Sequence, residues 1–127
     1  YVMGALLGDG SFRCGTPKLY GADVEILLRA QDECEKHLGR RFEIKAYQKD
    51  FFTLWLSYGS APKASPVLTE LRRLSLWRTD SRTKFIPAEY MFGSISQREA
   101  LLQGLLDTDG TVGISKGRSY ISYATTS

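Results

Sequence analysis

The spacing of hydrophobic residues changes along the chain, and each change predicts a different secondary-structure element. Residues 1–8 are almost continuously apolar and end at Gly8-Asp9-Gly10, which predicts the end of a buried helix. From about Asp23 to Leu38 apolar residues recur near helical spacing, and Gly39 follows them. This pattern predicts a long amphipathic helix.

Two central segments, 41–47 and 51–58, instead alternate between apolar and polar residues, which predicts an antiparallel hairpin with a turn at 48–50. One face of the hairpin should lie in the core. Its residues are Phe42, Ile44, Ala46, Phe52, Leu54 and Leu56. The opposite face should be exposed. Its residues are Arg41, Glu43, Lys45, Tyr47, Thr53, Trp55 and Ser57.

The remaining elements are predicted from turn and capping residues. A short hairpin is expected within 11–20, and a second one at 111–115 and 120–125. Ser65 and Pro66 should open a helix that carries Leu68, Leu71, Leu74 and Leu76. A short helix should follow Pro87, and a capping box at Ser96–Glu99 should open a helix that ends near position 109.

The order of these elements predicts an α+β fold in which helices cover one face of an antiparallel sheet. It corresponds to one αββαββα repeat over residues 1–95 and the start of a second over 96–127. Because the first helix begins at Tyr1 and the second repeat is short, the chain is expected to be a fragment of a longer protein.

Composition narrows the class of protein only modestly. Seventeen basic and fourteen acidic residues give a net charge of +3, which permits nucleic-acid binding without requiring it. The two cysteines, Cys14 and Cys34, lack the spacing of a metal site or a disulfide framework. No apolar run approaches the roughly 20 residues of a membrane span, and no signal peptide is visible. We therefore expect an intracellular protein, cytoplasmic or nucleoid-associated, that does not bind membranes.

One sequence pattern occurs twice. Val2–Gly10 reads VMGALLGDG and Leu102–Gly110 reads LQGLLDTDG, so the aspartates at positions 9 and 109 are 100 residues apart. In each copy two small residues are four positions apart and share a helix face: Gly4 and Gly8 in the first, Gly104 and Thr108 in the second. These faces predict two helices whose backbones approach more closely than the usual separation of roughly 8–10 Å.

An aspartate at the end of each of two adjacent helices suits the hydrolysis of a phosphodiester. That reaction requires a divalent metal to polarise the phosphoryl oxygen and to stabilise the leaving alkoxide. Magnesium typically takes one or two carboxylates from protein and keeps several waters. Asp9 and Asp109 are therefore candidate catalytic and metal-binding residues for Mg²⁺.

The two motifs resemble those of LAGLIDADG homing endonucleases, and Lys84-Phe-Ile-Pro87 resembles the Lys-x-Ile-Pro block of the dodecapeptide type found within inteins. The resemblance implies a site-specific double-strand DNA endonuclease, monomeric and pseudo-dimeric when full length. It implies that Asp9 and Asp109 bind metal and that Lys84 belongs to the catalytic centre. The resemblance is incomplete in three respects. Leu7 stands where the second copy has Asp107, the second repeat's lysine would follow position 127, and the protein-splicing segments of an intein are missing.

The DNA-binding surface is expected on the polar sheet face and the adjacent loops. Its candidate residues are Arg13, Lys18, Arg41, Lys45, Tyr47, Lys49, Thr53 and Trp55. Such side chains would contact phosphates and the major-groove edges of double-stranded DNA.

Simpler interpretations remain open from the sequence. Each aspartate could be a turn residue after a helix, Lys84 could be an ordinary solvated lysine, and the polar face could be a plain hydrated surface. A calcium loop starting at Asp107 is disfavoured because its twelfth position is Arg118 rather than glutamate. A non-catalytic DNA- or RNA-binding relative, such as a regulator or a splicing cofactor, and an inactive fragment are the alternative functions.

Overall fold

The computed structural model describes residues 1–13, 15–57 and 65–125, so the predictions for Cys14 and Tyr58 lie outside the described residues. The chain is α+β, as expected. Its elements are α1 (Val2–Asp9), β1 (Gly10–Ser11), β2 (Lys18–Gly21), α2 (Val24–Leu38), β3 (Glu43–Gln48), β4 (Phe51–Trp55), α3 (Pro66–Arg73), α4 (Ala88–Met91), α5 (Ile95–Asp109), β5 (Gly110–Ser115) and β6 (Arg118–Tyr123). No helix in the described ranges is long and apolar enough to cross a membrane.

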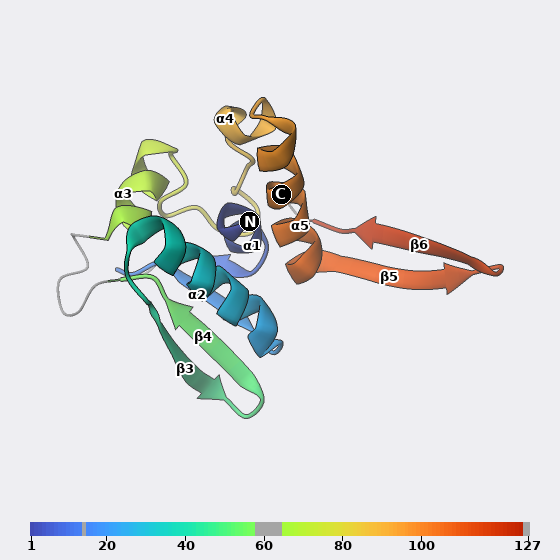
Figure 1. Cartoon of the computed structure of the whole chain (residues 1–127), viewed down its shortest axis with the longest axis horizontal. Helices are drawn as coiled ribbons and strands as arrows, with labels where there is room; N and C mark the ends of the chain where they lie inside the picture. The colour runs from blue at the N-terminus through green and yellow to red at the C-terminus, as the bar shows by residue number, and fades with distance from the viewer. Residues whose placement is uncertain (14, 58–64, 126–127) are drawn as a thin grey trace.

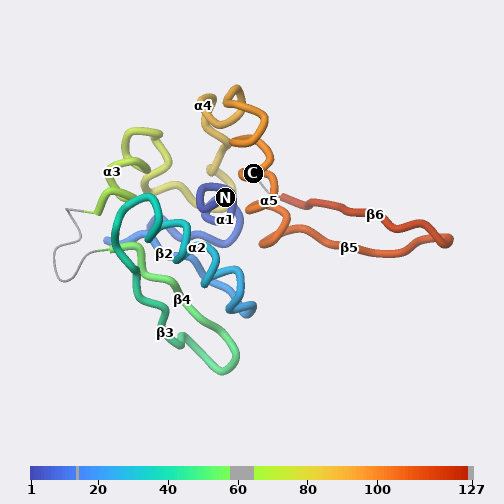
Figure 2. Tube along the Cα trace, in the orientation of Figure 1, coloured from blue at the N-terminus to red at the C-terminus, as the bar shows by residue number. Residues whose placement is uncertain are grey.

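The strands form two antiparallel sheets. The first has the order β1-β2-β4-β3, and β5 and β6 form a separate hairpin. Helix α2 lies along one face of the first sheet, while the β5–β6 hairpin projects away from the rest of the molecule (Figure 1). The Cα trace shows α1 between the α2 side of the molecule and α5 (Figure 2).

The amphipathic pattern of α2 explains how it covers the sheet. Its side chains Leu27, Ala30 and Cys34 are buried in the same core as Leu19 and Leu54 of the sheet. Asp23 caps the start of this helix by accepting a hydrogen bond from the Glu25 amide. Gly39 ends the helix with a φ of 68°, a left-handed conformation that favours glycine. The predicted bounds of this helix are confirmed.

The alternation in the central hairpin was predicted correctly for most core positions but not for all. Phe42, Leu54 and Leu56 are buried, whereas Ala46 is exposed, so its predicted core position is wrong. Ala46 lies on β3, the edge strand of the sheet, which has a neighbouring strand on one side only. Thr53 was expected to be exposed but is only 2% exposed. It lies on the inner strand β4, between its register partners Tyr20 on β2 and Lys45 on β3.

The second motif helix begins two residues earlier than predicted. Ser94, rather than Ser96, is its N-cap, and Ser94 and Gln97 form the capping box. The helix that Ser65 and Pro66 open is confirmed, but it ends at Arg73, so Leu74 and Leu76 are buried just beyond it.

The β5–β6 hairpin has an amphipathic pattern without a covering layer in the described part of the chain. Val112 pairs directly with Ile121, and these residues are 75% and 67% exposed. In the first sheet the apolar face is buried beneath α2. Helix α5 and the β5–β6 hairpin therefore have the same order of elements as α1 with β1 and β2, but none of the helices that the structure describes lies on this hairpin.

Candidate active site

The two motif helices pack against each other along their small residues. A Cβ added to Gly4 would collide with the Leu101 carbonyl oxygen and lie 2.9 Å from the Leu105 amide nitrogen. A Cβ added to Gly104 would collide with the Tyr1 carbonyl oxygen and lie 2.7 Å from the Ala5 amide nitrogen. Each glycine therefore receives the backbone of the opposite helix, which is the close approach that the sequence predicted.

The two helices also end alike. Gly10 follows α1 with φ −78° and ψ 152°, and Gly110 follows α5 with φ −78° and ψ 151°. Their amides donate to the carbonyls of Leu6 and Leu106, respectively. The repeated motif thus produces two almost identical helix ends, and Asp9 and Asp109 are the last helical residues of each.

These ends bring the two aspartates to a common cavity. A Cβ on Gly8 would lie 3.1 Å from Asp109 Oδ2, so the second carboxylate reaches the first helix. Asp9, Asp109 and Ser81 line a cavity of about 370 Å³. Desolvation by the surrounding protein raises the pKa of Asp9, the charge of Asp109 raises it further, and Lys84 opposes both effects.

Lys84 is not a solvated side chain, because it is only 8% exposed. Its Nζ lies within hydrogen-bond distance of four carbonyl oxygens at the end of α1, at 3.0 Å from Leu6, Leu7 and Gly8 and at 2.7 Å from Gly10, so its three N–H donors are shared among them. These carbonyls belong to the helix terminus and its cap, where intrahelical donors run out. Burial lowers the lysine pKa to about 8, while both aspartates act to raise it.

The donor set fits a magnesium ion of the kind that retains most of its water. Two carboxylates line one cavity, and their mutual repulsion is a cost that a divalent cation would relieve. Within the described ranges no group of three or more His, Cys, Asp or Glu side chains is placed to hold a metal. Asp9 and Asp109 would therefore supply the protein carboxylates for such an ion, and water would complete its coordination.

The polar face of the first sheet carries basic and aromatic side chains in contact. The Nζ of Lys18 lies 3.9 Å from the ring centre of Trp55, and the Nζ of Lys45 lies 5.1 Å from it. Lys45 also pairs with Glu43 at 3.1 Å. Trp55 is partly buried, so this ring supports two lysines rather than standing free in solvent.

An aromatic group continues this face. Tyr47 is 57% exposed and packs edge-on against Tyr20, with ring centres 5.3 Å apart. Phe51 lies on its other side, with ring centres 6.3 Å apart. Tyr20 is not among the residues predicted for this surface, although its position on a short strand, two residues after Lys18, could have indicated it.

The other candidate DNA-binding residues are more scattered. Arg41 is paired with Asp32 at 3.1 Å and Glu35 at 2.6 Å, both on α2, so it does not join the polar sheet face as expected. The regular strand begins only at Glu43, and alternation does not extend back to Arg41.

Two further candidate DNA-binding residues lie in loops. Lys49 is exposed in the hairpin turn. Arg13 is exposed and lies 3.8 Å from a carboxylate oxygen of Asp80.

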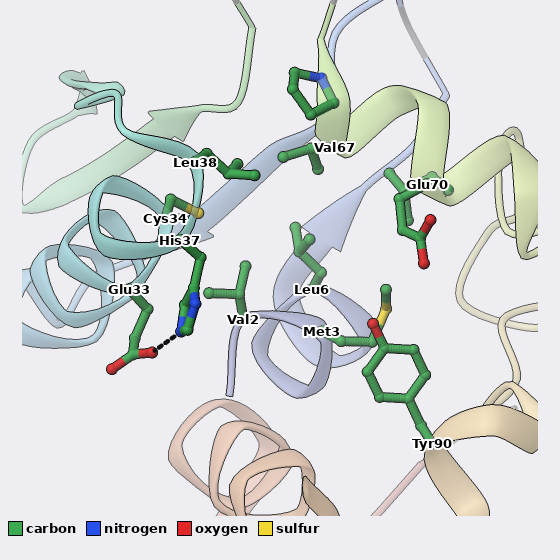
Figure 3. A pocket seen from close by; sticks show the side chains of 12 residues that line it. Val2, Met3, Leu6, Glu33, Cys34, His37, Leu38, Val67, Glu70 and Tyr90 are labelled. Atoms are coloured by element: carbon green, nitrogen blue, oxygen red, sulfur yellow. Dashed lines mark ion pairs between the residues drawn. The ribbon is translucent and has the colours of Figure 1, made fainter. Parts of the chain in front are cut away.

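A second cavity, of about 260 Å³, lies between α1, α2 and α3, with Tyr90 of α4 at its edge (Figure 3). Its walls are mainly apolar and include the Cys34 thiol, whose pKa burial raises to about 11. Glu33 and His37 form an ion pair of 3.4 Å at its rim. None of the aspartates or lysines of the predicted active site lines this cavity.

Comparison with known proteins gives one informative similarity. No protein-family model matches the chain. A protein described as the replicative DNA helicase DnaB of Mycobacterium intracellulare is 32% identical over 112 residues. The match covers 88% of this chain but only 14% of that protein, so the similarity extends over a small part of the helicase's length.

Proposed function

We propose that this chain is a LAGLIDADG-type homing endonuclease domain that hydrolyses double-stranded DNA with magnesium. One observation carries the proposal. Two helices pack through their backbones, end in the same conformation and direct Asp9 and Asp109 to one cavity beside Lys84. Turn residues that merely follow a helix would not need this close approach.

Bound magnesium would polarise the phosphoryl oxygen and lower the pKa of a coordinated water. The chain's own residues would perform the remaining tasks. Asp9 and Asp109 hold negative charge at the helix ends, and the helix interface fixes their separation. Lys84 keeps the end of α1 in place through its four carbonyl contacts. With a pKa of about 8 it is mostly protonated at neutral pH, so it supplies positive charge near the phosphate rather than a general base.

The similarity to a helicase supports an origin within an intein. A chain that matches 14% of a replicative helicase has the size relation of an insertion to its host. The Lys-Phe-Ile-Pro block supports the same subfamily. We propose that the chain is the endonuclease part of an intein in a DnaB-type helicase.

The polar sheet face would bind the duplex. Lys18 and Lys45 carry the positive charge, and Trp55, Tyr20 and Tyr47 form an aromatic floor beneath and beside them. Phosphate contacts would come from the lysines, and any base contacts would come from the same face.

Plasmid cleavage tests the proposal. The protein is expressed with the sequence that flanks it in its gene, and the plasmid carries the host gene with the insertion removed. We expect magnesium-dependent linearisation in the wild type and loss of linearisation in Asp9→Asn and Asp109→Asn. Asp32→Asn is the matched control, because this exposed carboxylate lies on α2 and pairs with Arg41.

The outcome separates the two functions considered. Binding of the plasmid site without cleavage in the wild type would favour a non-catalytic DNA-binding relative. Cleavage that survives in both aspartate variants would refute the assignment of the active site.

A further inference from the structure

Asp107, the acidic residue that the first motif lacks, makes a contact that the sequence did not indicate. Its Oδ2 lies 3.3 Å from Nη1 of Arg29, which is 78 residues away on α2. Nη2 of the same arginine donates to Gln103 Oε1 at 2.7 Å. Arg29 thus binds two side chains of α5 at once.

The arginine is also held from α1. Its guanidinium carbon lies 3.9 Å from the ring centre of Tyr1, the residue that precedes α1. Cation–π stacking of this kind fixes the plane of the guanidinium. Arg29 therefore connects α2, the start of α1 and the last turns of α5.

Helical geometry links this contact to the aspartate. Gln103 and Asp107 are four residues apart and share one face of α5, while Gly104 and Thr108 face α1. Asp109 follows Asp107 by two residues in the same final turn. Rotation of that turn about the helix axis would move the Asp109 carboxylate, and the contacts of Arg29 oppose such rotation.

The two helix ends are held by different residues. Lys84 binds the carbonyls at the end of α1, and the residue of α1 that corresponds to Asp107 is Leu7, which is buried in the core. In the described part of the chain, the hydrogen bonds of Lys84 go to α1 and to the residue after it, and Arg29 binds the side chains of α5. The second motif, which carries the additional acidic residue Asp107, is therefore the one that Arg29 binds.

We infer that Arg29, Gln103 and Asp107 form a positioning clamp that orients Asp109 for metal binding. This inference rests on the proposed function, since it assigns the clamp to the same site. Arg29 and Asp107 are positioning residues, because neither is placed among the groups that line the cavity of the two aspartates. The clamp does not bind metal itself.

Binding of Mn²⁺, followed by electron paramagnetic resonance, tests the inference without a DNA target. Asp107→Leu gives the second motif the residue of the first, and Arg29→Gln removes the charge from the other side. We expect each to weaken Mn²⁺ binding by about 10-fold, as is typical when a residue that orients a metal ligand is removed. The reciprocal double variant Arg29→Asp with Asp107→Arg should recover most of the affinity, which a merely destabilised fold would not do.

Arg41→Gln is the matched control. Like Arg29, Arg41 is exposed and pairs with carboxylates, but its ion-pair partners Asp32 and Glu35 lie on α2 rather than on α5. It should bind Mn²⁺ like the wild type. All affinities are measured well below the melting temperature of each variant, and Gln103→Ala, which removes a single hydrogen bond, replaces any clamp variant that does not fold.

The failures of the two proposals are distinguishable. If Asp9→Asn and Asp109→Asn leave Mn²⁺ binding unchanged, the proposed active site is wrong. If those variants lose the metal while Asp107→Leu, Arg29→Gln and Gln103→Ala retain wild-type affinity, the active site stands and the clamp is refuted.

Discussion

Replacement of Gly104 by alanine tests the contact on which the whole site depends. The new Cβ would collide with the Tyr1 carbonyl oxygen and lie 2.7 Å from the Ala5 amide nitrogen and 3.1 Å from the Gly4 carbonyl carbon. All three atoms belong to backbone, so they cannot move aside as the end of a flexible side chain can. The helices must separate, and the variant should be less stable than the wild type.

The magnitude follows from two opposing terms. Overpacking of a close interface costs about 1–3 kcal/mol. Alanine in place of glycine within a helix returns up to about 1 kcal/mol. The two terms leave a net loss of about 0–3 kcal/mol. We expect a value near the middle of this range, about 1–2 kcal/mol, for Gly104→Ala, because all three atoms that the Cβ meets belong to backbone. The loss should be larger for Gly104→Leu or Gly4→Leu.

Urea denaturation followed by circular dichroism provides the measurement. With a typical slope of about 1–3 kcal/mol per molar urea, the expected loss shifts the midpoint by about 1 M. Arg98→Ala, on the exposed side of α5, is the control and should stay within about 0.5 kcal/mol of the wild type. If Gly104→Ala unfolds at or above the wild-type midpoint, the two helices do not approach as closely as the geometry requires.

Three further predictions concern charge. Burial lowers the pKa of Lys84 to about 8, below its value in the unfolded chain. The unfolded chain therefore binds more protons between about pH 8 and 10, and the stability of the wild type relative to Lys84→Met should rise over this range. A difference in melting temperature that does not change with pH would contradict this. Asp9→Asn should raise stability at neutral pH, because the raised pKa of Asp9 makes its ionised form unfavourable in the folded state. This gain should shrink as pH falls through the raised pKa and be absent below the pKa of the unfolded chain. A thermal melt at pH 7 in EDTA that shows no gain would count against the coupling. Glu43→Gln releases Lys45 from its ion pair and should strengthen DNA binding at low salt. Lys45→Ala should weaken DNA binding and reduce the slope of log affinity against log salt by about 0.9. Fluorescence anisotropy with the host-gene duplex measures both quantities, and unchanged affinity and salt slope in the two variants would refute the prediction.

Local sequence patterns predicted the elements well because each pattern is read within one segment. The helix predicted from about Asp23 to Leu38 follows from its period and its end signals, and the three predicted hairpins follow from alternation and turn residues. The start of α5 was misplaced for an equally local reason. Ser94-Ile-Ser-Gln97 and Ser96-Gln-Arg-Glu99 both satisfy the capping-box spacing, and the sequence does not distinguish between boxes two residues apart.

Strand alternation, in contrast, predicts the direction of a side chain but not what covers it. Thr53 shares the face of Lys45 and Tyr20 by register, and it is buried because β4 lies between two other strands. Ala46 points in the core direction and is exposed because β3 is at the edge. Coverage depends on strand order, which is a long-range property and was not predicted.

In the candidate site, too, the local features were predicted and the long-range contacts were not. The repeated motif predicted two helices with small residues at four-residue spacing, and the backbones at their ends agree within 1° in φ and ψ at Gly10 and Gly110. Nothing in the motif predicted that Lys84 would bind three carbonyls of α1 and the carbonyl of Gly10 after it, or that Arg29 would reach Asp107 across 78 residues.

The two helix ends share their backbone conformation, which the local motif specifies, but differ in the distant side chains that bind them. A duplicated motif constrains the backbone of both ends, because glycine packing and the Asp-Gly termination are encoded within nine residues. The side chains that hold each end come from other parts of the chain. Lys84, which precedes the second motif, holds the end of α1, and Arg29 of α2 holds the end of α5. Asp9 and Asp109 therefore lie at helix ends of the same backbone geometry, but different side chains hold those ends: Lys84 binds carbonyls at the end of α1, whereas Arg29 binds Gln103 and Asp107 of α5. Asp9→Asn and Asp109→Asn should consequently differ in their effects on stability even where they abolish the same reaction.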